Sequence, residues 1–160
     1  MADDPVGGDG VTLVPVPSGA GLDDVDRLTG GRSPGAGWPH ADTAVALTFT
    51  AAGGETWLVV DADGHVVGEC GTKAPPLDGT VEIGYGLAAA SRGRGLGARA
   101  VQTLLAELSR RPDVRSVVAN VAVDNLASRR LLERQGFQVI RMSGGEVGYA
   151  LHLARPRQVR

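Results

Sequence analysis

The sequence predicts a single α+β (mixed α/β) domain in which helices pack against a mixed β-sheet. Its length of 160 residues suits one domain and is sufficient to bury a hydrophobic core. Runs with strand-like and helix-like periodicity follow one another without an internal repeat, in the order hairpin, strand, helix, strand, helix, hairpin. This mixed order is typical of α+β and α/β folds that contain a mixed sheet.

The composition is that of a globular protein with few aromatic residues, with 42% hydrophobic, 21% charged and 4% aromatic residues. No apolar run is long enough to span a bilayer, and the acidic start MADDPVGGDG lacks the apolar segment of a signal peptide. Cys70 is the only cysteine, so no internal disulfide can form, and we expect a cytoplasmic protein without a membrane partner. The net charge of −2 gives no support to nucleic-acid binding.

The first forty residues are the least regular part of the chain. Residues 1–10 are expected to form a flexible tail. Residues 12–16 predict an edge strand, because Pro15 has no N–H to donate within a sheet. Residues 22–28 predict a short helix, and residues 30–40, which are rich in Gly and Pro, predict a loop.

The middle of the chain has clearer signals. Residues 41–54 are Ala-rich like a helix and Thr-rich like a strand, and the two glycines at their end favour a helix that stops there. Residues 55–73 are two β-type runs around Asp63-Gly64, which predicts a hairpin. Residues 80–87 alternate apolar side chains with Glu and Gly, which predicts a strand with one buried face.

The second half alternates helices and strands. Residues 96–111 repeat apolar side chains at helical spacing, and residues 114–123 predict a buried strand. Asp124 or Asn125 can cap the next helix, which Gly136 is expected to end.

The chain closes with a second predicted hairpin, around two glycines at positions 144 and 145. The domain is expected to cover residues 11–154, followed by a basic tail over residues 155–160.

The charges are unevenly distributed along the chain. Residues 55–82 hold six acidic side chains against Lys73, whereas residues 92–134 hold nine arginines against four acidic residues. If the two stretches flank a cleft, one wall suits a cationic ligand and the other an anionic ligand. Solvated surface charge is the alternative interpretation.

A glycine-rich stretch, SRGRGLGARA at residues 91–100, lies between a predicted strand and a predicted helix. Gly93, Gly95 and Ala98 satisfy G-x-G-x-x-G/A, the fingerprint of dinucleotide-binding folds. Such a fold also needs an acidic residue about 20 positions later, at the end of the next strand, and further strand–helix units. The chain supplies neither, so the sequence disfavours dinucleotide binding.

Arg92, Gly95 and Gly97 also form R-x-x-G-x-G, which resembles the acyl-CoA-binding loop of the GNAT superfamily of N-acyltransferases. Residues 125–137, NLASRRLLERQGF, resemble that family's N-x-x-S/A-x-x-L-x-E-x-x-G-F signature. The resemblance spans roughly residues 55–153 and is greatest to the ribosomal-protein N-terminal acetyltransferase branch. It implies the GNAT fold, a single domain with a mostly antiparallel central sheet flanked by helices, and acetyl-CoA as the cosubstrate.

The resemblance assigns the cosubstrate to particular residues. Tyr85, Gly86 and Leu87 match the strand whose backbone pairs with the pantetheine arm, and Asn125 and Ser128 match pantetheine-side residues of the later helix. Glycine N–H groups at a helix N-terminus suit a pyrophosphate, and arginines add charged contacts. The residues expected there are Arg92, Gly93, Arg94, Gly95, Leu96, Gly97 and Ala98.

Acetyl transfer to an amine needs a base for the ammonium group and a proton for the departing thiolate. Glu82 is the predicted base, because family members often carry a glutamate there and only glycines share its strand face; orienting a substrate cation and plain solvated charge are the alternatives. Glu69, on the neighbouring strand, is expected to share this task or to attract the ammonium. Many GNAT enzymes use a tyrosine as the acid, where this chain has Leu132. The predicted acid is therefore Ser128, acting directly or through water.

The remaining polar residues receive mainly structural roles. Tyr85 and Tyr149 are weaker candidates for the acid, and Tyr149 is expected to line the substrate cleft. Cys70 is expected to be a small buried residue, because direct transfer requires no acyl-enzyme. No metal is expected, since metal-ligand spacing is missing among His40, His65 and His152. Core or loop packing is expected of Trp38 and Trp57, with contact to substrate as an alternative for Trp38.

The resemblance and the charge pattern together predict an N-acetyltransferase that moves an acetyl group from acetyl-CoA to a primary amine within a ternary complex. The acidic stretch favours a cationic acceptor, either a protein N-terminus or a small-molecule amine. An aminoglycoside-type antibiotic acetyltransferase is the alternative among enzymes, and a non-catalytic acyl-CoA-binding sensor is the alternative outside them. A homodimer is also expected as an option, since GNAT proteins are often dimers.

Overall fold

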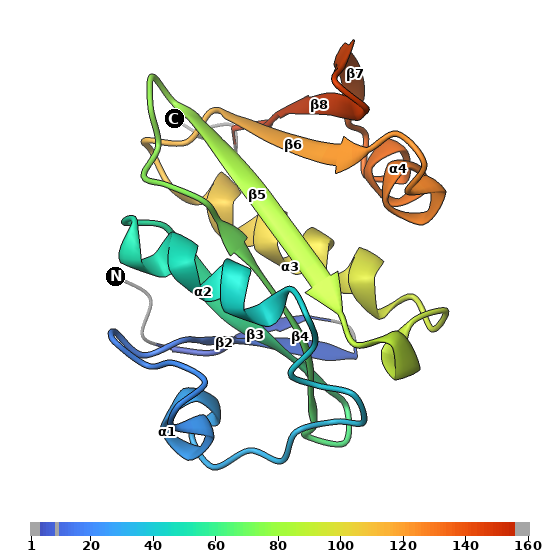
Figure 1. Ribbon diagram of the computed structural model, residues 1–160. Helices are drawn as coiled ribbons and strands as arrows, with labels where there is room; N and C mark the ends of the chain where they lie inside the picture. Colours follow the sequence, from blue (N-terminus) through green and yellow to red (C-terminus); the bar gives the residue numbers. More distant parts are fainter. Residues whose placement is uncertain (1–3, 9, 156–160) are drawn as a thin grey trace.

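The computed structural model describes residues 4–8 and 10–155, and it contains an eight-stranded sheet with helices on both faces (Figure 1). The strands are β1 (Val6–Gly8), β2 (Val11–Pro15), β3 (Glu55–Asp61), β4 (Val66–Thr72), β5 (Thr80–Leu87), β6 (Ser116–Ala122), β7 (Gln138–Ser143) and β8 (Glu146–His152). The α-helices are α1 (Val25–Thr29), α2 (Thr43–Ala51), α3 (Leu96–Ser109) and α4 (Leu126–Arg134), and a 3₁₀ turn, η1 (Ala89–Ser91), precedes α3.

The sheet order is β1-β2-β3-β4-β5-β6-β8-β7, and every neighbouring pair is antiparallel except β5 and β6. A single parallel pair follows from the connection: β5 leads through α3 into β6, and a helical crossover returns the chain in the same direction. The predicted mixed, mostly antiparallel α+β sheet is confirmed.

The parallel pair β5–β6 is short. It runs only from Thr80 opposite Ser116 to Glu82 opposite Val118. Beyond Glu82, β5 continues to pair with β4, whereas β6 pairs with β8 along its whole length. Each strand therefore follows its own half of the sheet, and the two separate toward their C-terminal ends (Figure 1).

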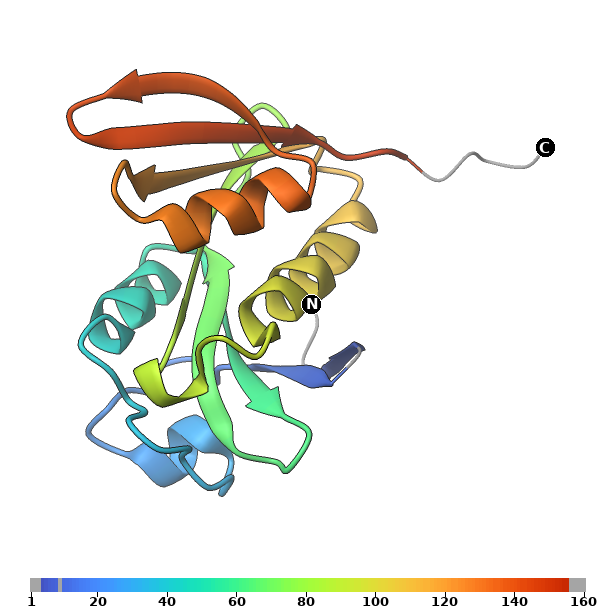
Figure 2. The same ribbon diagram turned by 90° about the vertical axis from the view of Figure 1, so that its right-hand side faces the viewer.

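The helices divide the core into two parts. The larger cluster lies between the sheet and α3, where Leu104 and Leu108 of the helix are fully buried together with Trp57 and Ile83 of the sheet. The smaller cluster lies on the opposite face and includes Leu28 of α1. Figure 2 shows α2 and α3 on opposite sides of β4 and β5. Because both faces of these strands are covered, polar side chains that they point toward α2 are held away from bulk water.

Most elements predicted from the sequence are confirmed, including the ambiguous residues 41–54, which form α2. The first ten residues are corrected: Val6–Gly8 form β1, which pairs with β2, so β2 is not the outermost strand. Pro15 lies beyond the last β1 pair, so its missing N–H interrupts no ladder on that side.

The cap residues of α4 refine two further predictions. Asn125, rather than Asp124, is the N-cap, and its side chain accepts a hydrogen bond from the backbone of Ser128. Gln135 is the C-cap, and Gly136 follows it in the left-handed conformation. Residues 156–160 of the predicted basic tail lie outside the described residues. In the described part of the chain, the helices are all too short or too polar to cross a bilayer.

Candidate functional site

A cavity of about 550 Å³ opens where β5 and β6 separate. This volume lies within the range of small-molecule sites. The lining comes from α2, β3, β4, β5, β6 and the start of α4, together with residues just before α2, just after β4 and at the start of β8. The site is thus formed by the diverging strands together with α2 and the start of α4.

The β5 wall of the cavity is formed by Ile83, Gly84, Tyr85 and Gly86. These residues pair with β4 along one edge, and the opposite edge has lost β6 as a partner beyond Glu82. A strand edge presents alternate N–H and C=O groups, which an extended ligand can pair with. Leu87, also predicted to contact the cosubstrate, is not among the cavity-lining residues; its side chain lies close to Gly97 instead.

The glycine-rich loop joins this strand to α3 and has an open backbone. Gly93 and Gly95 adopt left-handed conformations with φ of 79° and 75°, and a Cβ at either position would meet no atom within 4 Å. The two glycines therefore serve the backbone conformation and leave the loop surface clear. Gly97 differs: a Cβ there would lie 3.3 Å from Leu131, so this glycine allows α3 and α4 to approach.

The N-terminus of α3 carries unpaired donors. Gly95 caps the helix without a side-chain hydrogen bond, and the first turn contains no acidic residue. The N–H groups of a first helical turn have no carbonyl partner within the helix, and the helix dipole favours an anion there. Arg92 and Arg94 are exposed beside this turn, and the Arg92 Nε donates to the Leu87 carbonyl at 3.3 Å. The loop and helix start together fit a phosphate group.

The α4 wall of the cavity contains Asn125 and Ser128. The Asn125 Oδ1 accepts a hydrogen bond from the Ser128 N–H at 3.2 Å, which fixes the start of the helix. Tyr85 reaches this wall from β5, and its hydroxyl lies 3.4 Å from the Ser128 carbonyl oxygen. Burial raises the pKa of Tyr85, so the phenol keeps its proton at neutral pH. The sequence placed Tyr85 with the cosubstrate-binding residues and as a weaker candidate for the acid; its contact with the α4 wall depends on the separation of β5 from β6, which the sequence did not predict.

Glu82 lies at the last β5–β6 pair and outside the lining of the cavity. Its Oε1 accepts hydrogen bonds from Lys73 Nζ at 2.7 Å and from Asn120 Nδ2 at 3.2 Å. Partial burial acts to raise the pKa of Glu82, but these hydrogen bonds and the charges of Lys73 and Arg141 outweigh it and hold the pKa below its usual value. A lowered pKa makes a carboxylate a weaker proton acceptor.

Glu69 of β4 lines the cavity and is only 2% exposed. Its Oε2 accepts hydrogen bonds from the Trp38 Nε1 at 2.9 Å and from the Thr43 hydroxyl at 3.2 Å. Its Oε1 lies 2.6 Å from the His40 Nε2. Burial raises the pKa of Glu69, and the Trp38 hydrogen bond, the interaction with His40 and the Thr43 hydrogen bond offset this only in part.

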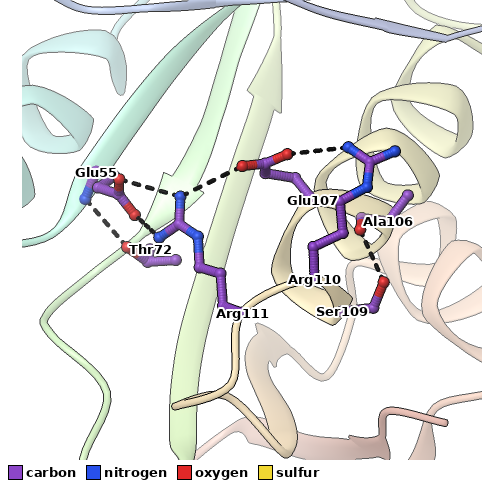
Figure 3. Close-up of polar contacts among 7 residues, drawn as sticks. All are labelled: Glu55, Thr72, Ala106, Glu107, Ser109, Arg110 and Arg111. Carbon is purple, nitrogen blue, oxygen red and sulfur yellow. Dashed lines mark hydrogen bonds and ion pairs between the residues drawn. The ribbon is translucent and has the colours of Figure 1, made fainter. Parts of the chain in front are cut away.

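The charged stretches predicted to flank a cleft are dispersed by the fold. Of the six acidic residues over 55–82, Glu69 alone lines the cavity, and the described arginines line none of it. Glu55 instead pairs with Arg111 on the far side of the sheet, where Arg111 also approaches Glu107 (Figure 3). The acidic groups at the cavity are Asp42, Glu69 and Glu146, of which only Glu69 belongs to the predicted stretch.

Tyr149, Cys70 and Trp57 are all buried, and their surroundings correct or refine the roles predicted for them. Tyr149 was expected to line the cleft but is fully buried, with its hydroxyl donating to Glu133 at 3.0 Å and accepting from Arg129 at 3.2 Å. Cys70 is buried as expected, and burial raises the pKa of its thiol, yet it also lines the cavity. Trp57 is buried in the core, with the Arg111 guanidinium 5.7 Å from its ring centroid.

One group of potential metal ligands occurs among the described residues, although no metal site was expected from the sequence. Asp61, Asp63 and His65 lie together at the β3–β4 turn. The Asp61 Oδ1 already accepts backbone hydrogen bonds from Asp63 at 3.0 Å and His65 at 2.9 Å, so this carboxylate shapes the turn.

Comparison with known proteins agrees with this geometry. A model of the acetyltransferase (GNAT) domain family matches residues 24–138. An uncharacterized N-acetyltransferase of Bacillus subtilis (strain 168), YjdG, is 29% identical over 111 residues; the aligned part is 62% of this chain and 66% of that protein, just under two thirds of its length.

Solved structures share the fold over nearly the whole chain. RimL, described as a ribosomal L7/L12 alpha-N-protein acetyltransferase in complex with coenzyme A, superposes with a TM-score of 0.68 at 19% identity, covering 94% of this chain and 98% of that one. A putative GNAT-family acetyltransferase from Bordetella pertussis gives a TM-score of 0.63 at 25% identity, covering 92% and 98%.

Proposed function

The chain belongs to the GNAT acetyltransferase family, and on that premise we propose that it transfers an acetyl group from acetyl-CoA to a primary amine, with both substrates bound at once. One observation supports this most directly. The open edge of β5 leads from the cavity into the glycine loop at the start of α3, so an extended cofactor arm and its phosphates have adjoining sites.

Acetyl-CoA is placed along this path. The pantetheine arm pairs with the backbone at Gly84–Leu87, in the space that β6 leaves. The pyrophosphate lies on the loop over residues 92–98 and on the N–H groups of the first α3 turn, beside Arg92 and Arg94. Asn125 and Ser128 close the α4 side. This placement needs no metal ion, because backbone donors and arginines supply the countercharge.

The departing thiolate needs a proton, and two hydroxyl groups are at hand. Ser128 and Tyr85 both line the cavity where the thioester end of the arm would lie. We keep Ser128 as the proton donor predicted from the sequence and assign Tyr85 to hold the α4 wall through its contact with Ser128. The effects of Ser128→Ala and Tyr85→Phe on kcat distinguish these two roles.

The acceptor is proposed to be a cationic primary amine, either a protein N-terminus or a small-molecule amine. The lining contains the acidic residues Asp42, Glu69 and Glu146 against the single basic residue Lys73, which is itself paired with Glu82. RimL, which shares the fold, is described as acting on a protein N-terminus, which keeps that class first. Aminoglycosides are the alternative acceptor class and are included among the amines to be tested. The homodimer is a separate prediction, which sedimentation of the protein would test.

The testing experiment measures thiol release from acetyl-CoA against peptides with free N-termini, polyamines, amino acids and aminoglycosides. Turnover with one class supports the proposal and names the acceptor. Thermal protection by coenzyme A without any turnover would support the acyl-CoA sensor instead.

A matched pair of glycine variants isolates the cosubstrate loop. Gly93→Ala and Gly31→Ala place a Cβ in nearly identical left-handed conformations, with φ of 79° and 78°, and neither Cβ meets an atom within 4 Å. Similar backbone strain is expected in both. Coenzyme A affinity should fall at least about tenfold only in Gly93→Ala, because only that loop is proposed to hold the phosphates. Equal affinities would remove the loop from the proposal.

A further inference from the structure

The segment before α2 folds around a single buried carboxylate. Trp38, His40 and Thr43 all direct a polar group at Glu69, although 26 to 31 residues separate them from it in sequence. The His40 N–H also donates to the Thr43 hydroxyl at 3.1 Å, so the donors support one another. Because three side chains contact this one carboxylate, its position and orientation are closely fixed.

The strand opposite makes room for this cluster. Glu69 of β4 pairs with Gly86 of β5, and a Cβ on Gly86 would lie 3.1 Å from the His40 ring and 3.6 Å from the Glu69 Oε1. A side chain at position 86 would therefore displace the imidazole. The cluster consequently lies directly against the stretch of β5 where the pantetheine arm of acetyl-CoA is proposed to bind.

The hydrogen bonds leave acceptor capacity on one oxygen of Glu69. Oε2 receives two donors, which is the usual capacity of a carboxylate oxygen. Oε1 is approached by the His40 Nε2, without an aligned hydrogen bond. The His40 Nδ1 accepts from the Asp42 N–H at 3.2 Å, which places the proton of a neutral ring on Nε2. Oε1 therefore retains a lone pair on a residue that lines the cavity.

We propose that Glu69 is the carboxylate that binds the acceptor's ammonium group and takes its proton, and that Trp38, His40 and Thr43 are its positioning residues. The proposal rests on the proposed acetyl transfer and differs from the sequence-based assignment of this role to Glu82. The ammonium donates an N–H to Oε1 and then passes that proton to the carboxylate. The neutral nitrogen attacks the thioester carbon, the C–N bond forms and the C–S bond breaks. Ser128 delivers a proton to the departing thiolate and is reprotonated by the second proton that leaves the nitrogen, directly or through water. Glu69 returns its own proton to solvent after product release, so the net reaction releases one proton.

The environment of Glu69 agrees with a proton acceptor. Burial holds its pKa above the ordinary value, and a carboxylate with a raised pKa is a stronger proton acceptor. Glu82 has the opposite shift and is occupied by Lys73 and Asn120. The other titratable groups at Glu69 or in the same cavity are His40, Asp42, Cys70, Lys73, Tyr85 and Glu146.

Trp38 provides a direct spectroscopic probe. Its indole N–H donates to Glu69, whereas the only other indole N–H, that of Trp57, is buried and has no hydrogen-bond partner among the described residues. In ¹⁵N-indole-labelled protein saturated with coenzyme A, butylamine should shift the Trp38 signal saturably and leave Trp57 unmoved. Tetramethylammonium, a cation with no N–H, should have no such effect. In the wild-type protein, the Trp38 signal should follow the titration of Glu69, to which its indole N–H donates. Bound butylamine should lower the pH midpoint of this titration, because an ammonium group stabilises the ionised carboxylate.

Variants separate Glu69 from Glu82. Glu69→Gln should abolish the butylamine response and lower kcat/KM at least about 100-fold, with coenzyme A affinity within twofold of wild type. Glu82→Gln should keep the Trp38 response. Thr43→Val should raise the pH midpoint of the Trp38 titration, since it removes a donor to the carboxylate, and Thr43→Ser should restore it.

Three results would overturn the proposal: a butylamine response that survives in Glu69→Gln, an equal shift of both indoles, or no shift of Trp38 at 100 mM butylamine. Failure of the acetyl-transfer proposal has a different signature, namely no coenzyme A binding and no thiol release in wild-type protein. The Trp38 titration in wild-type protein decides the matter even if Glu69→Gln does not fold.

Discussion

The imidazole of His40 lies 2.6 Å from the carboxylate of Glu69 and occupies the space that a side chain at Gly86 would enter. The first residue comes from the loop before α2, the second from β4 and the third from β5. A substitution in any of the three elements can therefore disturb the contact between His40 and Glu69. Gly86 is the most useful position to replace, because the distances from a new Cβ to its neighbours are known.

Gly86→Ala is expected to disturb this contact. The new Cβ would lie 3.1 Å from the His40 Cε1 and 3.4 Å from its Nε2, so the ring must move away from Glu69. We expect the midpoint of the Trp38 indole titration to rise, because the carboxylate loses its stabilising contact with the His40 ring. Gly84→Ala is the matched control, since its Cβ meets only the Lys73 Cε at 3.4 Å. An unchanged Trp38 titration in Gly86→Ala would show that His40 does not tune Glu69.

Glu82 is expected to stabilise the fold in a pH-dependent way. Its folded pKa lies below the unfolded value of about 4.3, so ionised Glu82 stabilises the protein above that pH, and the contribution disappears as the pH falls through the folded pKa. Glu82→Gln should therefore cost about 1 kcal/mol or less at pH 7, since the pair with Lys73 is partly exposed, and almost nothing at pH 3. Urea unfolding at both pH values measures this. The same loss at pH 3 would rule out the charge as its origin.

The ion pair between Glu55 and Arg111 is expected to contribute to stability without affecting catalysis. Arg111 holds Glu55 with both terminal nitrogens, one at 3.1 Å, and lies over the ring of Trp57, so it ties the end of α3 to β3 (Figure 3). A double-mutant cycle with Glu55→Gln and Arg111→Met should give a coupling free energy of about 1 kcal/mol, smaller in high salt. Neither residue lines the cavity, and thiol release should remain at the wild-type rate. A coupling near zero would mean that the pair is compensated by solvent.

Ser128 and Tyr85 are expected to differ in their kinetic effects. If Ser128 delivers the proton to the thiolate, Ser128→Ala should lower kcat about tenfold or more, while Tyr85→Phe lowers it less. Coenzyme A affinity should stay within a few-fold of wild type in both, because the backbone at residue 85 makes the proposed cosubstrate contact. Stopped-flow single turnovers measure the chemical step. A larger loss in Tyr85→Phe would transfer the role of acid to the phenol.

Local sequence was sufficient to predict most of the secondary-structure elements and the two motifs of this protein. Hydrophobic periodicity predicted the hairpins and α3, and the α+β class followed from their order. The glycine loop was recognisable because positive φ and an open backbone are properties of the glycines themselves, as Gly93 and Gly95 show. The second motif placed Asn125 and Ser128 together, because residues three apart on a helix share a face and an N-cap bonds to the third residue onward.

Tertiary structure decided the partners of the charged residues. Glu82 and Glu69 lie on neighbouring strands, and from sequence both were candidates for the base. The fold gives Glu82 to Lys73 and Asn120 and lowers its pKa, whereas it buries Glu69 beneath the loop before α2 and raises its pKa. A pKa depends on burial and on charges brought close in space, and in these two carboxylates the donors come from residues up to 38 positions away. Sequence thus determined which elements form, and only the packing of those elements determined which carboxylate faces the cavity.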